Sequence, residues 1–483
     1  MNLDRIARLL GLRYATAALV LLAVAALYGA ASLSRPADRA TAADRGRTVP
    51  VRSAVAVCPG REGARLTVQS AKTTRTGGRA DVVRAPDGAV IGSLTTPGGA
   101  WSTYLETAKD SFTVWAHGAV AAGLEAEQTT HWPKGKDRGL AGLRCASPGT
   151  DQWFLGPGPV AAESVELHLT NADAQPATVD VTALSGEGPL DTADGSGTPV
   201  PPYSTRVVTV GASPEGLGDI VRTAADLGLR VRATTGRVAA SLRVRIAEGK
   251  GIDWVAPAPA PGTSLVIPGV PGGEGRRRLL IAVPGQDDAA VQVQVITQNG
   301  AFAPQGRHTL DAPAGTVTAL DLDRSLGGKP AAVRLRSDRP IVAGFAAERG
   351  ADVAYGTATA PLRGTGFGVV SDNRYDTTLS LTAPQGAATV RITPIGPQGP
   401  AAPQDVSVQA GRTVEVPLKA PVGGENGYGV LIEPRPGSGP VHAARILAKN
   451  KGEKLLFTVL PITPASTVLR LPSVGGGQGA LLP

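Results

Sequence analysis

Apolar and polar residues alternate over short stretches along most of this chain, which is typical of β-strands with one buried face. The clearest example spans residues 231–246, where two alternating runs flank a turn at residues 234–236. In the second run, apolar residues from Val238 to Ile246 share one face, and the opposite face carries Arg243 and Arg245. The stretch therefore predicts a β-hairpin with one buried side.

The same pattern recurs three more times, which indicates repeated modules. The equivalent positions are Val120, Val238, Ile341 and Val441, so successive copies lie 118, 103 and 100 residues apart. About seven short strands per 100 residues favour an immunoglobulin-like sandwich. We therefore expect an all-β chain of tandem antiparallel β-sandwich modules, and a β-propeller-like arrangement of the repeats is the alternative.

The repeats also suggest where the chain divides. The predicted parts are a signal anchor or signal peptide at 1–33, a flexible linker at 34–54, β modules at 55–149, 150–272, 273–371 and 372–474, and a flexible tail at 475–483. Helical periodicity is persuasive only at Pro214–Leu227, which we expect to form a short helical insertion in the second module.

The N-terminus predicts the compartment. Arg5, Arg8 and Arg13 flank an uncharged, mostly apolar stretch from Tyr14 to Ser34. This stretch is long enough to cross a bilayer, and it also has the three-part form of a secretion signal. Its length favours an uncleaved, single-pass anchor in the cell membrane, with the bulk of the chain extracytoplasmic. Secretion after cleavage near Ala31 is the alternative.

The two cysteines agree with export. Cys58 and Cys145 are the only ones in the chain, and both lie beyond the apolar stretch. An exported chain with two cysteines most simply forms one disulfide, which would tie the start of the first module to its end.

An aromatic pair opens the second module. Trp153 and Phe154 are followed by a glycine and by two alternating strands within residues 164–183. This order resembles the repeat unit of an uncharacterised family of secreted or membrane-anchored bacterial envelope proteins, in which a Trp-Tyr-Phe-Ala-Glu-Gly type motif opens each unit. The resemblance covers mainly residues 145–183, and Leu155-Gly156 replaces the usual ending. It implies an envelope location and a β fold, and it carries no catalytic residue.

Composition and charge limit the classes of partner that we expect for this chain. The hydrophobic content of 42% supports packed cores and excludes wholesale disorder. The net charge of +8 is spread along the chain, and the one compact run, Arg276–Arg278, is expected in a solvated loop before a strand. No basic face with interleaved aromatics is present, so we expect no nucleic-acid partner.

Candidate chemistry is sparse. The five histidines are far apart, so none has the spacing of a metal pair. Glu125 and Glu127, like Asp321 and Asp323, share a strand face as an acid–base pair would, and a solvated face is the expected role. No phosphate-binding glycine loop opens a helix. We therefore predict no catalytic, cofactor-binding or metal site.

Aromatic residues concentrate in the first third of the chain, and three of them are the predicted binding surface: Trp132, Trp153 and Phe154. We expect a non-enzymatic, membrane-tethered rod of β-sandwiches that binds or scaffolds envelope polysaccharide or other envelope proteins. One alternative is an extracellular hydrolase of cell-wall or capsule polymers, which carboxylates from different modules around one groove would favour. The other is an accessory subunit of an envelope-polymer synthesis or export system.

Overall fold

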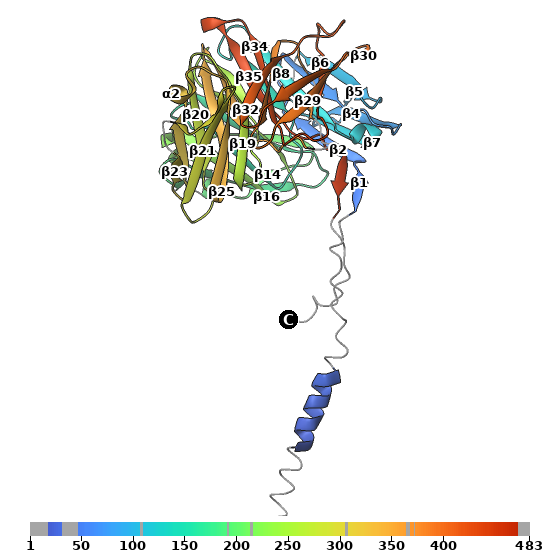
Figure 1. Cartoon of the computed structure of the whole chain (residues 1–483), viewed down its shortest axis with the longest axis vertical. Coiled ribbons are helices and arrows are strands. Elements are labelled where there is room, and N and C mark those ends of the chain that lie inside the picture. Colours follow the sequence, from blue (N-terminus) through green and yellow to red (C-terminus); the bar gives the residue numbers. More distant parts are fainter. Residues whose placement is uncertain are drawn as a thin grey trace, which may run out of the picture. The chain divides into compact units, whose positions relative to one another are not determined.

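The computed structural model describes residues 18–30, 47–106, 110–190, 193–212, 216–304, 308–363, 368–370 and 372–471. The chain divides into two compact units, one of residues 1–49 and 469–483 and one of residues 50–468. Figure 1 shows the second unit as an assembly of antiparallel strands, and strand is by far the main secondary structure of the chain. The predicted all-β class is therefore confirmed.

The first unit holds part of the predicted anchor. Residues 18–30 are helical, as the blue helix in Figure 1 shows. Among the described residues, no helix is both long enough and apolar enough to cross a membrane. The rest of the predicted anchor, most of the predicted linker and the predicted tail lie outside the described residues. A short two-stranded sheet pairs β1 (Thr48–Pro50) with β36 (Val468–Arg470).

The first module is a sandwich of two antiparallel sheets. Its strands are β2 (Ser53–Cys58), β3 (Ala64–Gln69), β4 (Gly78–Arg84), β5 (Val90–Leu94), β6 (Ala100–Leu105), β7 (Phe112–Gly118), β8 (Glu125–Trp132) and β9 (Gly139–Arg144). The sheet orders are β2-β7-β4-β5 and β6-β3-β8-β9. Apolar residues that alternate along both sheets, such as Leu66, Val82 and Val114, form one buried core between them.

The second module repeats this plan. Its strands are β10 (Asp151–Pro157), β11 (Ser164–Asn171), β12 (Ala177–Leu184), β13 (Pro189–Leu190), β14 (Thr198–Val200), β15 (Ser204–Thr209), β16 (Asp226–Thr235), β17 (Ala239–Arg245) and β18 (Ile252–Val255). One sheet has the order β10-β16-β12-β13, with β14 also on β12, and the other has the order β15-β11-β17-β18. Of the short helical insertion predicted at Pro214–Leu227, the described residues show a 3-10 helix at Asp219–Thr223, and β16 begins at Asp226; Pro214 lies outside the described residues.

The third and fourth modules follow the same order. The third contains β19 (Gly262–Val270), β20 (Arg276–Ala282), β21 (Ala289–Thr297), β22 (Gly300–Phe302), β23 (Thr309–Ala312), β24 (Val317–Asp321), α2 (Asp323–Leu326), β25 (Ala331–Arg349) and β26 (Asp352–Thr357). The fourth contains β27 (Gly368–Val370), β28 (Asp376–Ala383), β29 (Ala388–Gly396), β30 (Gly399–Pro400), β31 (Gln404–Val408), β32 (Arg412–Pro417), β33 (Gly429–Pro434), β34 (His442–Lys449) and β35 (Leu456–Ile462). β19 pairs with β25 and β27 with β33, so each groups with the module after the predicted boundary, not before it.

The predicted hairpins are arches between sheets. β16 pairs with β10 and β12, whereas β17 pairs with β11 and β18 in the opposite sheet. In the third module the two segments are one continuous strand, β25, whose first part pairs with β19 and β21 and whose later part pairs with β20 and β26. The hairpin prediction was wrong because two strands that face each other across a core show the same alternation as two paired strands.

The predicted rod is also wrong, because the first and last modules touch. The final strands of the four modules pack in a cycle: β9 lies against β18 and β35, and β26 lies against the same two strands. The first, second and fourth modules are pairs of sheets, and the third is one eight-stranded sheet joined through β25. No described β-ladder joins one module to another, so the propeller alternative is not found. The modules instead meet through side chains and through single backbone hydrogen bonds, such as that from the Val317 N–H to the Ser185 carbonyl oxygen at 2.8 Å.

Two buried aspartates lie at this meeting point. Asp352 is 1% exposed, and its Oδ2 accepts hydrogen bonds from the backbone N–H groups of Leu140 in β9, at 3.1 Å, and Phe457 in β35, at 2.9 Å. Asp253 is 0% exposed and accepts from the Gly142 N–H at 2.9 Å and from the Thr458 hydroxyl. Burial raises the pKa of Asp352 to about 7 and raises that of Asp253 as well.

Candidate functional site

A groove with a cavity of about 680 Å³ lies between the first and second modules. We call it the Trp132 groove, and its lining includes Arg61, Trp132, Lys134, Asp137, Glu166 and His168. Both modules contribute side chains to it, so the groove exists only because the two modules pack together.

The first module supplies the aromatic wall. Trp132 is the last residue of β8 and is half-buried, and the following loop carries Asp137 to the same cavity. Gly60 of the first module also lines the groove. It has a φ of 66°, and its N–H donates to Gln128 Oε1 at 3.0 Å. A Cβ there would lie 1.9 Å from the carbonyl oxygen of Asp110, so the loop can pass only with glycine at this position.

The second module supplies the charged floor. Glu166 and His168 lie two residues apart on β11, so they share one face. Arg243 lies directly opposite Glu166 on β17, and its guanidinium donates to Glu166 Oε2 at 3.2 Å. His168 Nε2 lies 3.5 Å from the same oxygen. The paired strands therefore hold one carboxylate between two nitrogen groups.

Arg243 joins the two modules. Its side chain is 5% exposed, and Nη2 donates to Asp137 Oδ2 at 2.9 Å. The guanidinium carbon also lies 6.0 Å from the centre of the Trp132 ring, within reach of a cation–π contact. Arg245 adds a second link to Asp137, at 3.4 Å. The arginines on the face of β17 predicted to be solvated are therefore buried, because the first module covers that face.

The electrostatics of the groove follow from these contacts. The nearby ring nitrogen of His168 and the positive charge of Arg243 lower the pKa of Glu166 to about 2, although burial opposes them. Burial lowers the pKa of His168, whose ring packs edge-on against Trp254 with the ring centres 5.2 Å apart. At neutral pH the floor therefore presents a fixed carboxylate and a neutral imidazole.

This arrangement suits recognition of a polyhydroxylated molecule. Fixed carboxylates accept hydrogen bonds from hydroxyl groups, and Arg61 and Lys134 can donate to them. The half-buried ring of Trp132 offers an apolar surface beside these groups. Among the described residues, no group of three or more histidine, cysteine or acidic side chains could hold a metal ion.

The other predicted surface aromatics are not accessible. Trp153 is 4% exposed and packs with Leu155, Leu280 and Val342 where the second and third modules meet. Phe154 is 0% exposed and belongs to the core of the second module. Of the three predicted residues, only Trp132 lines a cavity.

The predicted disulfide is present. Cys58 and Cys145 are bonded, with their Cα atoms 4.7 Å apart, within the range that a disulfide spans. The bond joins the end of β2 to the residue that follows β9, so it closes the first module on itself.

The two carboxylate pairs were predicted on solvated faces, and for the first pair this is wrong. Glu125 accepts hydrogen bonds from Arg144 at 2.5 and 2.6 Å, and Glu127 forms a buried ion pair with Arg445 of the fourth module. In the second pair, Asp323 begins α2 and accepts the backbone N–H of Arg277 at 2.8 Å.

The charged floor of the groove was not predicted from the sequence. A usable signal was present, because Glu166 and His168 alternate with apolar residues on one strand and Arg243 and Arg245 do so on another. Opposite charges that alternate with apolar residues on two strands can face each other as a cross-strand pair when the strands are neighbours. The contribution of Asp137 from a loop of the neighbouring module had no such signal.

Comparisons with known proteins place the chain in one family. A family model described as "Family of unknown function (DUF5719)" matches residues 102–419, which include the whole of the segment that carried the resemblance, residues 145–183. No curated protein sequence matches the chain. The crystal structure of a tetra-tandem repeat in the extending region of a large adhesion protein is 13% identical over 86% of this chain and all of that chain. Its TM-score is 0.09, too low to support a structural argument.

Proposed function

This chain belongs to the DUF5719 family, whose function is unknown, and from that premise we propose that it is a non-enzymatic envelope protein that binds a glycan outside the membrane. The observation that carries this proposal is the Trp132 groove, in which an aromatic ring and fixed charged groups from two modules line one cavity of about 680 Å³.

The groove is built to hold its shape. Arg243 binds Glu166 of its own module and Asp137 of the neighbouring module, so the wall and the floor are tied together before any ligand arrives. Preorganised side chains lose little conformational freedom on binding, which favours affinity for a flexible, hydrated ligand. The ring of Trp132 would pack against the apolar face of a sugar while the charged groups bind its hydroxyls.

Two further features support an extracytoplasmic location. The Cys58–Cys145 disulfide is of the kind that persists in oxidising compartments and is rare in the cytosol. The apolar stretch between Tyr14 and Ser34 has the composition of an export segment. We propose that this segment tethers the chain to the membrane, with secretion after cleavage near Ala31 as the alternative.

The test is a Trp132→Ala substitution in the full chain. The affinity for isolated envelope polysaccharide, measured by co-sedimentation, should fall at least about fivefold, since loss of a stacked aromatic costs on the order of 1–3 kcal/mol. Tyr104→Ala is the matched control, because Tyr104 is a well-exposed aromatic of the same module that does not line the groove. Unchanged retention of a folded Trp132→Ala variant would refute the proposal.

Hydrolysis of an envelope polymer ranks second. Asp137 and Glu166 come from different modules and meet at Arg243, as a shared catalytic groove would require. The depressed pKa of Glu166, about 2, weighs against this role, since a general acid needs a raised pKa. Release of reducing sugars by the wild-type chain, abolished by Glu166→Gln, would place this function first.

A further inference from the structure

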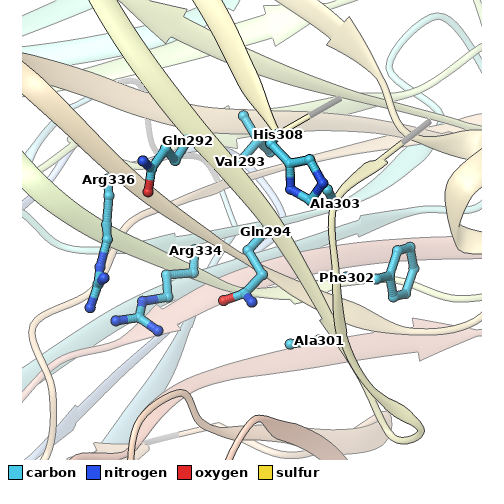
Figure 2. A pocket seen from close by; sticks show the side chains of 9 residues that line it. All are labelled: Gln292, Val293, Gln294, Ala301, Phe302, Ala303, His308, Arg334 and Arg336. Atoms are coloured by element: carbon cyan, nitrogen blue, oxygen red, sulfur yellow. The ribbon is translucent and has the colours of Figure 1, made fainter. Parts of the chain in front are cut away.

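A second cavity, of about 440 Å³, lies on the outer face of the third module, far along the chain from the Trp132 groove. Figure 2 shows the polar and aromatic side chains that line it. They are Gln292, Gln294, Phe302, His308, Arg334 and Arg336, and we call this site the Arg334 pocket.

The pairing of two strands creates the floor of the pocket. β21 and β25 are antiparallel neighbours, with Gln292 opposite Arg336 and Gln294 opposite Arg334. The residues between them, such as Val293 and Val295, are buried in the core, so the amides and guanidinium groups all lie on the outer face. β22 pairs with the end of β21 and forms one wall, which carries Phe302.

The two arginines have no carboxylate partner. Among the described residues, neither Arg334 nor Arg336 forms an ion pair, and no acidic residue lines the pocket. Asp338 follows on the same strand, but it accepts the backbone N–H of Ala290 and does not line the cavity. Burial and the nearby charge of Arg336 lower the pKa of Arg334, as expected for neighbouring cations without a counter-charge.

Arg334 also has an unused hydrogen-bond donor. Its Nη1 lies 3.4 Å from the carbonyl oxygen of Pro384, which anchors the guanidinium against the fourth module. Its Nη2 is buried and has no hydrogen-bond partner in the protein. A buried donor without a partner is costly, so such a group is normally satisfied by a ligand or by water.

We propose that the Arg334 pocket binds an acidic sugar unit, that is, a carboxylate or phosphate group on a polyhydroxylated ring. The paired guanidinium groups suit an oxyanion, because arginine presents parallel N–H donors to two oxygens at once. Gln292 and Gln294 can both donate to and accept from ring hydroxyls. Phe302, which is 38% exposed, supplies an apolar surface for the ring. This site is separate from the Trp132 groove and does not depend on it.

Isothermal titration of the full chain with four probes tests the proposal. The probes are trigalacturonate, glucose 1-phosphate, neutral maltotriose and inorganic phosphate. The two acidic sugars should bind at least about tenfold more tightly than maltotriose. Hydrogen bonds from the guanidinium groups to an anion are stronger than hydrogen bonds to a neutral hydroxyl group. Their affinity should fall as salt is raised, since the site is open to solvent.

Variants assign the binding to this pocket. Arg334→Gln and Arg336→Gln should each weaken both acidic sugars at least about tenfold. Phe302→Ala should weaken trigalacturonate and leave inorganic phosphate unchanged. Arg232→Gln, which changes an exposed strand arginine of the second module, should change nothing. Trp132→Ala should also leave this binding unchanged, so the result stands apart from the proposed role of the groove.

Three results would overturn the inference. Equal binding of maltotriose and trigalacturonate would remove the requirement for an anion. Wild-type affinity for acidic sugars in a folded Arg334→Gln, Arg336→Gln double variant, with an unchanged unfolding transition, would place the binding elsewhere. Equally tight binding of inorganic phosphate, with no effect of Phe302→Ala, would overturn the assignment to a sugar.

Discussion

At the residue scale, buried aspartates connect strands that no β-ladder connects. Asp352 accepts backbone N–H groups from β9 and β35, and Asp253 accepts one from β9 and a hydroxyl from β35. These donors lie on strand edges that face another module and would otherwise be buried without a partner. A carboxylate in such a place satisfies the donors, but it is costly to ionise.

The raised pKa of Asp352 makes stability depend on pH. With a folded pKa of about 7 and an ordinary unfolded value near 4, the folded state binds the extra proton between these values. The contribution of this group to the free energy of unfolding is therefore present below about pH 4 and lost as pH rises to about 7. The expected slope is about 1.4 kcal/mol per pH unit. Urea unfolding between pH 4.5 and 8 measures it.

Asp352→Asn is the control that isolates this group. His442 has a pKa lowered to about 4 by burial, so its contribution runs in the opposite direction over much of the same range. The difference between wild type and Asp352→Asn cancels that contribution and should retain the slope assigned to Asp352. Parallel pH profiles for the two proteins would contradict the raised pKa.

Sequence patterns predicted some residue roles and not others. The Cys58–Cys145 bond could be predicted because the chain has only these two cysteines. The arginine run was wrongly predicted as a solvated loop. It starts β20, and Arg277 is 2% exposed, where it donates to carbonyl oxygens of the preceding loop, including that of Pro271 at 2.9 Å. A sequence shows the charge of an arginine but not the carbonyl groups that a folded loop will direct toward it.

At the element scale, strand positions were predictable and strand partners were not. The alternation around Val238 correctly located the strands now seen as β16 and β17. Their assignment to opposite sheets depends on how the short connection bends, and Gly236 with a φ of 68° serves an arch as well as a hairpin. The burial of both faces of β17 was also unpredictable, because a neighbouring module covers the charged face.

Edge strand β9 can approach β35 because it carries a glycine. A Cβ on Gly142 would lie 3.0 Å from Thr458 Cγ2 and 3.1 Å from Leu460 Cδ1, closer than comfortable packing. We expect Gly142→Ala to reduce the free energy of unfolding by about 1–3 kcal/mol, as overpacking typically does. Chemical denaturation of the purified variant measures this.

Gly149 offers the matched control. A Cβ there has Gln152 Nε2 at 3.8 Å as its nearest neighbour, so Gly149→Ala should change stability by no more than about 0.5 kcal/mol. Equal effects of the two substitutions would mean that the spacing between β9 and β35 does not matter to the fold.

At the scale of the whole second unit, a buried ion pair links residues 318 positions apart. Arg445 of β34 is 1% exposed and pairs with Glu127 of β8, while its other nitrogen donates to the side chain of Asn373 at 3.2 Å. The first and fourth modules therefore share a charged contact from which water is excluded. The local sequence of neither strand predicts this pairing, because each charged residue lies in an ordinary alternating strand.

Arg445→Ala should destabilise the protein strongly. Removing one partner leaves the Glu127 carboxylate buried without its cation, which costs about 3–5 kcal/mol in the free energy of unfolding. Amide hydrogen exchange should rise in both β8 and β34, since the contact joins two modules.

Arg391→Ala is the control, because Arg391 pairs with Asp405 on the exposed surface of the same module. This substitution should leave the free energy of unfolding nearly unchanged, because solvent screens an exposed ion pair. A change that small for Arg445→Ala, with unchanged exchange in β8, would show that the ion pair does not hold the modules together.

The contact between the first and fourth modules also bears on how such a chain can evolve. An open stack of repeats tolerates the gain or loss of a unit at either end, because each unit touches only its neighbours. Here an added repeat would have to separate β9 from β35 and Glu127 from Arg445, and a deleted one would leave their buried edges in water. The number of repeats is therefore fixed by packing, and insertions are expected to accumulate in loops that contact no other module.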